Sequence, residues 1–210
     1  MSYERHRKLS LAGIDASTLS VDEFRSLVDD ILQAKIHGIS FSPYVEGQKT
    51  GDDLTAAQIH ERLDIVRPHV HWVRTFSCSR GNELLPRIAK QYGLKVMAGV
   101  WLDDNHTQNE IELANGIEIA RAGDADILAV GNEVLLRGEM TEADLIDCIR
   151  RAKHAAPSAD VGYVDAYFKF SEHPRVTEAC DVVLANCYPF WEGYPAEHAL
   201  LYMKEMYRQA

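Results

Sequence analysis

Residues 128–136 read LAVGNEVLL, in which an apolar run ends in a glycine, an amide and a carboxylate before apolar residues resume. The segment 127–131 has the length and apolar composition of a buried strand, so Asn132 and Glu133 directly follow its carboxyl end. A carboxylate in apolar surroundings is costly unless it is paired or partly solvated. Some feature of the fold must therefore hold Glu133 at this place.

Similar apolar or β-branched segments recur along the chain. They predict strands at 38–42, 72–77, 95–102, 127–131, 160–164 and 181–188. Helical periodicity fills the intervals and predicts helices, the first capped by Ser20, at 21–35, 55–66, 82–92, 108–122, 141–156, 174–179 and 195–210. Because parallel strands need long crossover connections, this alternation predicts a parallel sheet covered by helices. Two architectures fit: a doubly wound open sheet, and a (β/α)₈ barrel represented by six units.

The residues that follow the strands favour the barrel. No GxGxxG or GxxxxGK[ST] motif follows the first strand, so the phosphate-binding loop of nucleotide-binding open sheets is absent. Polar or aromatic polar residues follow the strands instead: Ser42, Tyr44, Ser77, Ser79, Asp103, Asp104, Asn132, Glu133, Asp165, Tyr167, Asn186 and Tyr188. Barrels collect their active sites at this face. We predict the α/β class, with an N-terminal arm over 1–18 and the first six units of a TIM-type (β/α)₈ barrel over 19–210.

Composition narrows the class of ligand. The formal net charge is −10 and the acidic and basic residues are interspersed, which argues against a nucleic-acid surface. The N-terminus lacks the apolar core of a signal peptide, and no stretch approaches the roughly 18 apolar residues of a membrane span. We therefore expect a cytoplasmic protein.

The cysteines occur singly, without the spacing of a zinc site, and are expected to be reduced and buried: Cys78, Cys148, Cys180 and Cys187.

At the rim of a barrel, Glu133 can act as a general acid while Asn132 holds a substrate hydroxyl. Glycoside hydrolysis needs such an acid, and a second carboxylate about 5–5.5 Å away if configuration is retained. The alternative is structural: Glu133 pairs with Arg74 or Arg137.

Aromatic residues gather after the same strands: Tyr44, Trp101, Tyr167, Tyr188, Phe190 and Trp191. Each one alone is better explained by packing. As a set they favour a groove for sugar rings, whose apolar faces stack on aromatic side chains.

Other barrel chemistries fit the sequence less well. Lys95 begins its strand, whereas a Schiff-base lysine is expected at the other end. His69 and His71 precede their strand and His106 stands alone, so we expect no metal site and no cofactor. Asp103 and Asp104 fit a cation or sugar site, and equally a turn into a helix.

Six segments, in order and spacing, resemble glycoside hydrolase family 17, particularly bacterial members related to β-1,3-glucanases and β-1,3-glucan glucosyltransferases. They read GISFSPY, WVRTFSC, LKVMAGVWL, AVGNEVLLR, VGYVDAY and VVLANCYPFWEG. The resemblance implies a retaining (β/α)₈ barrel in which Glu133 is the general acid/base beside Asn132. It also implies that NCYPFW lines the substrate site through Asn186, Tyr188, Pro189 and Phe190. Asp165, Tyr167, Tyr44 and Trp191 complete the predicted substrate-binding set.

The family's nucleophile is a second Glu, at the end of the seventh strand, in a motif close to ETGWP. The present sequence contains no such motif. Glu192 stands on a loop beyond the sixth strand, and nothing in the sequence fixes it near Glu133.

Two hypotheses follow. The first is a glycosidase or transglycosylase acting on β-1,3-linked glucan, whose nucleophile lies outside this chain. The second is a non-catalytic carbohydrate-binding protein or a truncated barrel fragment. In either case we expect open barrel edges to favour self-association.

Overall fold

The structure is a computed structural model, and it describes residues 18–210. The N-terminal arm predicted for 1–18 lies, apart from Thr18, outside these residues. One sheet of parallel strands forms the centre, in the order β1-β2-β3-β4-β5-β6. Its strands are β1 (Ile36–Ser40), β2 (Val70–Arg74), β3 (Lys95–Val100), β4 (Ile127–Asn132), β5 (Asp160–Ala166) and β6 (Val182–Asn186). The chain order of the strands excludes the doubly wound sheet, in which the order reverses at a switch point.

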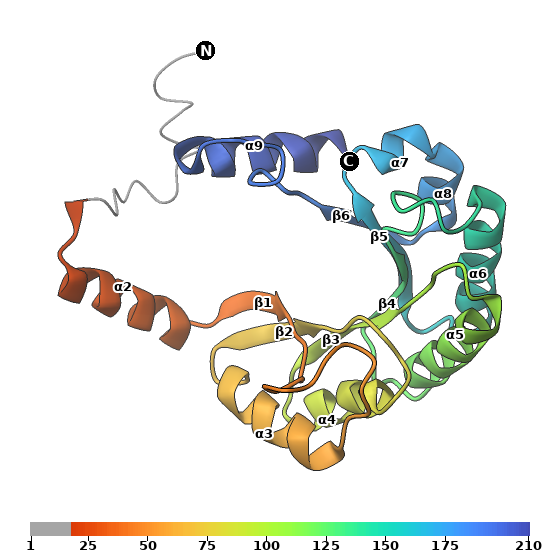
Figure 1. The fold of residues 1–210 in the computed structure, drawn as a ribbon, viewed down its shortest axis with the longest axis horizontal. Coiled ribbons are helices and arrows are strands. Elements are labelled where there is room, and N and C mark those ends of the chain that lie inside the picture. Colours follow the sequence, from red (N-terminus) through yellow and green to blue (C-terminus); the bar gives the residue numbers. More distant parts are fainter. Residues whose placement is uncertain (1–17) are drawn as a thin grey trace.

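Figure 1 shows the sheet curling into an incomplete barrel with helices on its outer side. The α-helices are α2 (Val21–Gln33), α3 (Ala56–Val66), α4 (Leu85–Gln91), α5 (His106–Arg121), α6 (Glu142–Ala155), α7 (Lys169–Glu172), α8 (Pro174–Ala179) and α9 (Ala196–Gln209). The α2 and α9 helices flank the open side, next to the edge strands β1 and β6. The prediction of six consecutive units of a TIM-type barrel is confirmed.

Local chemistry sets the helix starts. Ser20 caps α2 in a reciprocal capping box with Glu23, as the sequence predicts, and Thr55 and Thr141 cap α3 and α6. The single helix expected over 82–92 is instead a 3₁₀ turn, η2 (Asn82–Leu84), followed by α4. Pro86 accounts for this break, because proline lacks an N–H and is tolerated only in the first turn of a helix.

The core lies between the outer face of the sheet and the helices. Gly116 of α5 permits close packing, because a Cβ there would lie 2.4 Å from a methyl group of Val100 and 3.3 Å from one of Leu128. The open side is packed less tightly: α2 has no buried residue, and every residue of β6 is only half-buried. All four cysteines are free. The prediction of burial holds for Cys78 and Cys148, whereas the other two are half-buried.

Two aspartates brace neighbouring strands at the amino end of the sheet. The Asp126 carboxylate accepts hydrogen bonds from the Val96 N–H and from Lys90 Nζ, both at 2.8 Å. The Asp126 N–H in turn donates to the Val96 carbonyl at 2.9 Å. Asp181 contacts the backbone of Val161 in the same way, at 3.0 and 2.7 Å. These contacts join β3 to β4 and β5 to β6.

We expect Asp126→Asn to lower the free energy of unfolding by about 1–3 kcal/mol near neutral pH. Burial raises the pKa of Asp126, but the Lys90 ammonium, the Val96 N–H and the charge of Lys95 together bring this pKa below its usual value. A lowered folded-state pKa gives stability that is present above the unfolded-state pKa and is lost as pH falls through the folded-state pKa. The deficit of the variant should therefore shrink in acid.

Urea unfolding of both proteins across the acidic range measures this change. Asp104→Asn, at an exposed position, is the matched control and should leave stability unaltered. A deficit that stays constant with pH would contradict the electrostatic account.

Candidate active site

Three polar side chains from alternate strands meet at the carboxyl end of the sheet. Arg74, Asn132 and Asn186 are the last residues of β2, β4 and β6. The Arg74 guanidinium donates to Asn132 Oδ1 at 2.5 Å and to Asn186 Oδ1 at 3.5 Å. In barrels, side chains from alternate strands share one layer of the interior. The three residues thus form a polar layer at the mouth of the incomplete barrel.

The backbone turns sharply between this layer and Glu133. The pairing of β4 with β5 shifts register between Ala129 and Asn132, and Gly131 lies there with φ of 86°. Glu133 itself has φ of 55°, in the left-handed region that a residue with a Cβ rarely adopts. Its N–H donates to the Val164 carbonyl of β5 at 2.7 Å. Bulges and strained backbone of this kind are concentrated at functional sites, where they re-aim a side chain.

Two neutral donors hold the Glu133 carboxylate. Its Oε1 accepts hydrogen bonds from Asn186 Nδ2 and from the Tyr188 hydroxyl, both at 2.8 Å. Burial, together with the Glu133 charge, raises the pKa of Tyr188 to about 12, so its hydroxyl remains a donor throughout the neutral range. The alternative in which Glu133 pairs with Arg74 or Arg137 is not observed, because the hydrogen bonds of both arginines go to other groups. Glu133 is half-buried at the rim.

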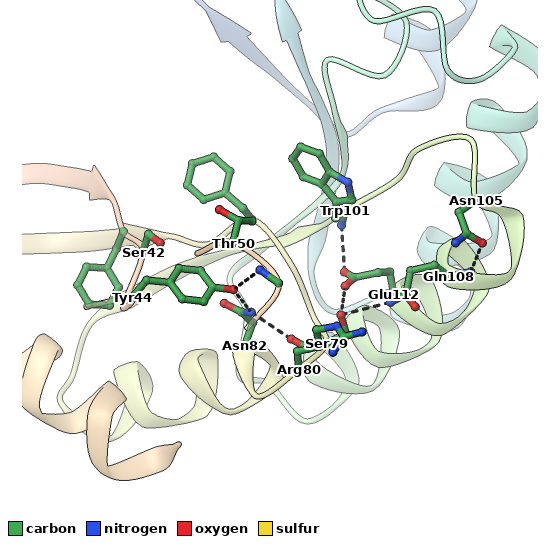
Figure 2. A pocket seen from close by; sticks show the side chains of 13 residues that line it. Ser42, Tyr44, Thr50, Ser79, Arg80, Asn82, Trp101, Asn105, Gln108 and Glu112 are labelled. Atoms are coloured by element: carbon green, nitrogen blue, oxygen red, sulfur yellow. Dashed lines mark hydrogen bonds between the residues drawn. The ribbon is translucent and has the colours of Figure 1, made fainter. Parts of the chain in front are cut away.

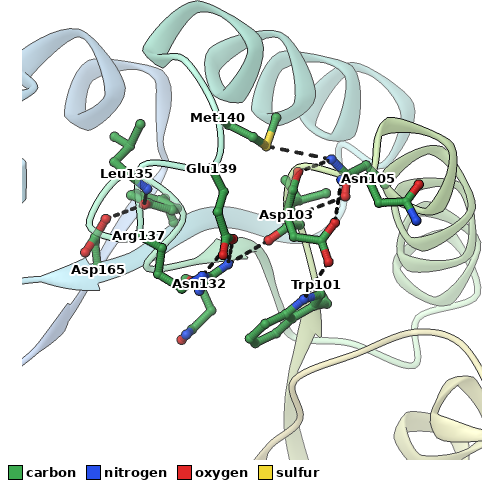
Figure 3. A network of polar contacts seen from close by, with 12 residues as sticks. Trp101, Asp103, Asn105, Asn132, Leu135, Arg137, Glu139, Met140 and Asp165 are labelled. Atoms are coloured by element: carbon green, nitrogen blue, oxygen red, sulfur yellow. Dashed lines mark hydrogen bonds and ion pairs between the residues drawn. The ribbon is translucent and has the colours of Figure 1, made fainter. Parts of the chain in front are cut away.

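The segment after Glu133 is fastened to the barrel by Arg137 (Figure 3). The Arg137 guanidinium donates to the carbonyls of Asn132 and Leu102, the latter at 2.9 Å, and pairs with Glu139 at 2.6 Å. It also lies over the Trp101 ring, 4.7 Å from the ring centroid. One cation therefore ties the end of β4 to the end of β3.

Asp165 lies in the same network, but it does not face the mouth. Its exposed fraction is 0%, and it accepts hydrogen bonds from the Tyr163 hydroxyl and the Ala166 N–H. Burial raises the pKa of Asp165, and the Glu133 charge adds to this effect. The Tyr163 hydroxyl also accepts from the Leu135 N–H at 3.0 Å. The expectation of direct substrate contact is thus not met here: Asp165 supports the turn that carries Glu133.

The predicted aromatic set divides into two groups. Tyr188, Phe190 and Trp191 follow β6, and the last two are 83% and 80% exposed. Tyr167 follows β5 and packs edge-on against Phe168. Of this group, the Tyr188 hydroxyl contacts Glu133 directly, whereas Tyr44 lies in another part of the barrel.

Tyr44 lines a cavity of about 640 Å³ at the carboxyl ends of β1, β2 and β3, here called the side cavity (Figure 2). Its hydroxyl accepts hydrogen bonds from the Gly51 N–H at 3.2 Å and from Asn82 Nδ2 at 3.3 Å. Phe76 and Trp101 also line the side cavity, as does Glu112, which lies at its base. A volume between about 300 and 1,000 Å³ is usual for a ligand pocket.

Sequence reasoning placed Trp101 among the aromatic residues of the expected sugar groove, but it did not place Arg74 or Glu112 among the site residues. Arg74 and Trp101 stand at or directly after strand ends, so their positions signalled the site face. Glu112 lies within the periodicity of a helix and carries no signal of this kind.

Within the described residues, the hydrogen-bond partners of the Glu133 side chain are Asn186 and Tyr188, and neither is a carboxylate. Asp165 is buried, as described. The Glu192 carboxylate accepts a hydrogen bond from the Tyr202 hydroxyl of α9 at 3.2 Å. Residues 18–210 also contain no group of three potential metal ligands, and no helix among them is long and apolar enough to cross a membrane.

Comparison with known proteins identifies a family. The model of the BtgE/BtgC glycoside hydrolase domain matches residues 38–210. A glucan 1,3-beta-glucosidase from Arthroderma benhamiae is 27% identical over 152 residues, which are 68% of this chain and 48% of the relative. The glucan 1,3-beta-glucosidase of Saccharomyces cerevisiae is 25% identical over 154 residues, 65% of this chain and 49% of its own. The chain thus spans about half the length of the curated relatives it matches.

A solved structure agrees with both fold and family. The glycoside hydrolase family 17 β-1,3-glucanosyltransferase from Rhizomucor miehei superposes with a TM-score of 0.72 at 26% identity. The match covers 84% of this chain and 66% of that one. An active-site mutant of the same enzyme, in complex with laminaritriose, matches equally well.

Proposed function

Because the chain belongs to the BtgE/BtgC glycoside hydrolase domain family, which is similar to glycoside hydrolase family 17, we propose that it supplies the acid/base half of a retaining active site. The substrate is β-1,3-linked glucan, and the reaction is hydrolysis or transglycosylation. Glu133 is the general acid/base. Asn132, Asn186 and Tyr188 are placed around it to orient it and to contact the sugar.

The surroundings of Glu133 carry this proposal. A general acid must hold and release a proton, and a permanent ion pair with Arg would oppose protonation. Glu133 is instead held by an amide and a phenol, and it stands half-buried at the mouth. It can donate its proton to the departing glycosidic oxygen and then take a proton from the water or sugar hydroxyl that attacks the intermediate.

We further propose that the nucleophile lies outside these 210 residues. A retaining site needs a second carboxylate about 5–5.5 Å from the first. No ETGWP-like motif occurs in the sequence, Asp165 is buried against Tyr163, and Glu192 is engaged with Tyr202. Asp165 and Glu192 therefore each already have a different hydrogen-bonding role.

The choice of β-1,3-glucan rests on relatives and on chemistry. The matched relatives are glucan 1,3-beta-glucosidases, and the matched structure holds laminaritriose in its mutant form. The exposed rings of Phe190 and Trp191 suit the apolar faces of a neutral sugar. The same rings also favour the second candidate function, saccharide binding without turnover.

A donor that bypasses the nucleophile distinguishes these functions. In an α-glucosyl fluoride the leaving group occupies the face on which the nucleophile would be bonded, so an acceptor hydroxyl can displace it directly. Fluoride leaves with the electrons of the C1–F bond, the acceptor oxygen forms the β-glycosidic bond, and the acceptor proton passes to Glu133. We therefore expect the chain to convert α-laminaribiosyl fluoride and laminaribiose into a tetrasaccharide, which mass spectrometry and NMR identify.

The linkage of the donor supplies the control. α-Cellobiosyl fluoride with the same acceptor should react more slowly, because its second ring projects in another direction from the site. Equal rates would contradict the proposed β-1,3 preference. Saccharide binding without product from either donor would favour the non-catalytic function.

A further inference from the structure

Glu133 is not among the residues that line the side cavity, but the cavity is connected to it through neighbouring side chains. We propose that the side cavity is a subsite for a glucosyl unit of the bound glucan, with the Trp101 ring as its platform and the buried Glu112 as its positioning residue. This inference rests on the proposed function and deepens it, because it states where the remainder of the sugar chain lies.

Two arginines connect the side cavity to the candidate active site. Phe76 and Trp101 form part of its wall. Arg74 lies 4.7 Å from the Phe76 ring centroid and donates to the side chain of Asn132. Arg137 lies 4.7 Å from the Trp101 ring centroid and donates to the backbone carbonyl of Asn132. Both aromatic walls are therefore only one side chain away from the residue that precedes Glu133.

The chemistry of the lining suits a neutral, polyhydroxylated ring. The aromatic walls offer apolar faces, and Ser42, Gln108 and Asn105 add hydroxyl and amide groups. The cation at the edge, Arg80, pairs with Asp53 at 3.7 Å. The buried carboxylate of the lining, that of Glu112, accepts hydrogen bonds from internal donors with both of its oxygens. The cavity thus offers a ligand neither an unpaired cation nor a carboxylate without hydrogen-bond partners, whereas an ionic ligand would require a counter-charge.

Glu112 organises this wall from beneath. It is 2% exposed, and its Oε1 accepts from the hydroxyls of Ser77 and Ser79 at 2.6 and 2.5 Å. Its Oε2 accepts from the N–H of Cys78 at 2.7 Å and of Trp101 at 3.1 Å. One carboxylate therefore fixes the loop after β2 and the residue after β3 at the same point.

The Trp101 ring is consequently set before any ligand arrives. Its backbone is held by Glu112, its Nε1–H donates to Asp103 Oδ2 at 3.3 Å, and Arg137 covers one face. A ring that is already immobilised loses little further entropy on binding, which favours affinity.

NMR of the isotope-labelled 210-residue chain tests the inference directly. Its three tryptophans, Trp72, Trp101 and Trp191, give three indole N–H signals, assigned by single Trp→Phe variants. On titration with laminaritetraose we expect the Trp101 signal to move. The position of the Trp72 signal should not change, because Trp72 is a residue of β2 and its ring stacks on His37.

Two substitutions of Glu112 separate positioning from simple stability. Glu112→Gln should retain saccharide affinity, because an amide oxygen can accept from the two backbone N–H groups while its NH₂ donates to the two serine hydroxyls. Glu112→Ala leaves these donors without their acceptor and should raise the dissociation constant about tenfold. If the Ala variant does not fold, Trp101→Ala is the second variant, with a similar expected loss of affinity.

The outcomes distinguish this inference from the proposed function. Movement of the Trp191 signal alone with laminaritetraose would overturn the subsite and leave glucan recognition intact. Movement of the Trp101 signal with cellotetraose but not laminaritetraose would support a sugar subsite and overturn the β-1,3 assignment. No movement with either sugar would overturn the subsite, while transfer from the fluoride donor tests the proposed function independently.

Discussion

Glu133→Gln should lower the rate of transfer from α-laminaribiosyl fluoride by about 100- to 10,000-fold, the usual contribution of a general acid/base. The amide has the size of the carboxylate, and its oxygen can still accept from Asn186 and Tyr188. It cannot take up the proton that the acceptor hydroxyl must lose. The substitution therefore removes proton transfer and leaves the shape of the site unaltered. Initial rates of product formation, followed by mass spectrometry, measure the loss.

Glu192→Gln is the matched control for this variant. It makes the same change of carboxylate to amide on the loop after β6, where the side chain is hydrogen-bonded to Tyr202. Its transfer rate should equal that of the wild type. If Glu133→Gln retained the wild-type rate, the acid/base assignment would be wrong. If Glu192→Gln alone lost activity, the acid/base role would move to the β6 loop. Thermal unfolding of each variant shows whether the fold is kept.

Gly81→Ala should cause the largest loss of stability, about 3–5 kcal/mol. Gly81 has φ of 85°, and a Cβ added there would lie 2.2 Å from the Leu54 carbonyl oxygen and 2.9 Å from its carbonyl carbon. These are backbone atoms of a segment that is itself fixed, because the Leu54 N–H donates to the Arg80 carbonyl at 2.9 Å. Neither of these two loop segments can move away without breaking the hydrogen bond between Leu54 and Arg80.

Gly123→Ala is the control for this variant. The difference between the two losses gives the part that is due to the steric contact. Gly123 has a similar φ of 78°, but an added Cβ would meet nothing within 4 Å. Its free energy of unfolding should therefore fall only by the cost of holding alanine in the left-handed conformation, about 1–2 kcal/mol. Urea unfolding of both variants gives the comparison. Equal losses would show that the approach to Leu54 is not constraining.

Much of the fold can be predicted from the sequence, because most strands and helices have a local sequence signal. The apolar runs at 95–102 and 127–131 and the caps at Ser20 and Thr141 are examples. The short α7 helix is not predictable in this way, since four residues are too few to show a period. The choice of a barrel over a doubly wound sheet required the polar residues after the strands, and the strand order confirms it.

The candidate site is less accessible to sequence reasoning, because its contacts join distant residues. Asn132 and Glu133 are adjacent and predictable as a pair. That Arg74 bonds Asn132, 58 residues away, follows only from the alternation of strands in the barrel layer. The left-handed backbone of Glu133 has no sequence signature, since glycine is the residue expected there. Asp165 shows the opposite failure: the sequence predicts that it follows a strand ending at residue 164, whereas it lies within β5 and is buried against Tyr163.

The sequential strand order has a consequence for dynamics. Each unit of the sheet pairs only with the units before and after it, so the assembly is quasi-one-dimensional, as in repeat proteins. In such an array local unfolding begins at the ends, where an element has one neighbour, and β6 is such an end. Asn186 and Tyr188, which hold the Glu133 carboxylate, belong to this last unit. Fraying of β6 would release the Glu133 carboxylate while β4 remains intact, so contacts at the outer edge of β6 would determine how long this carboxylate keeps its orientation.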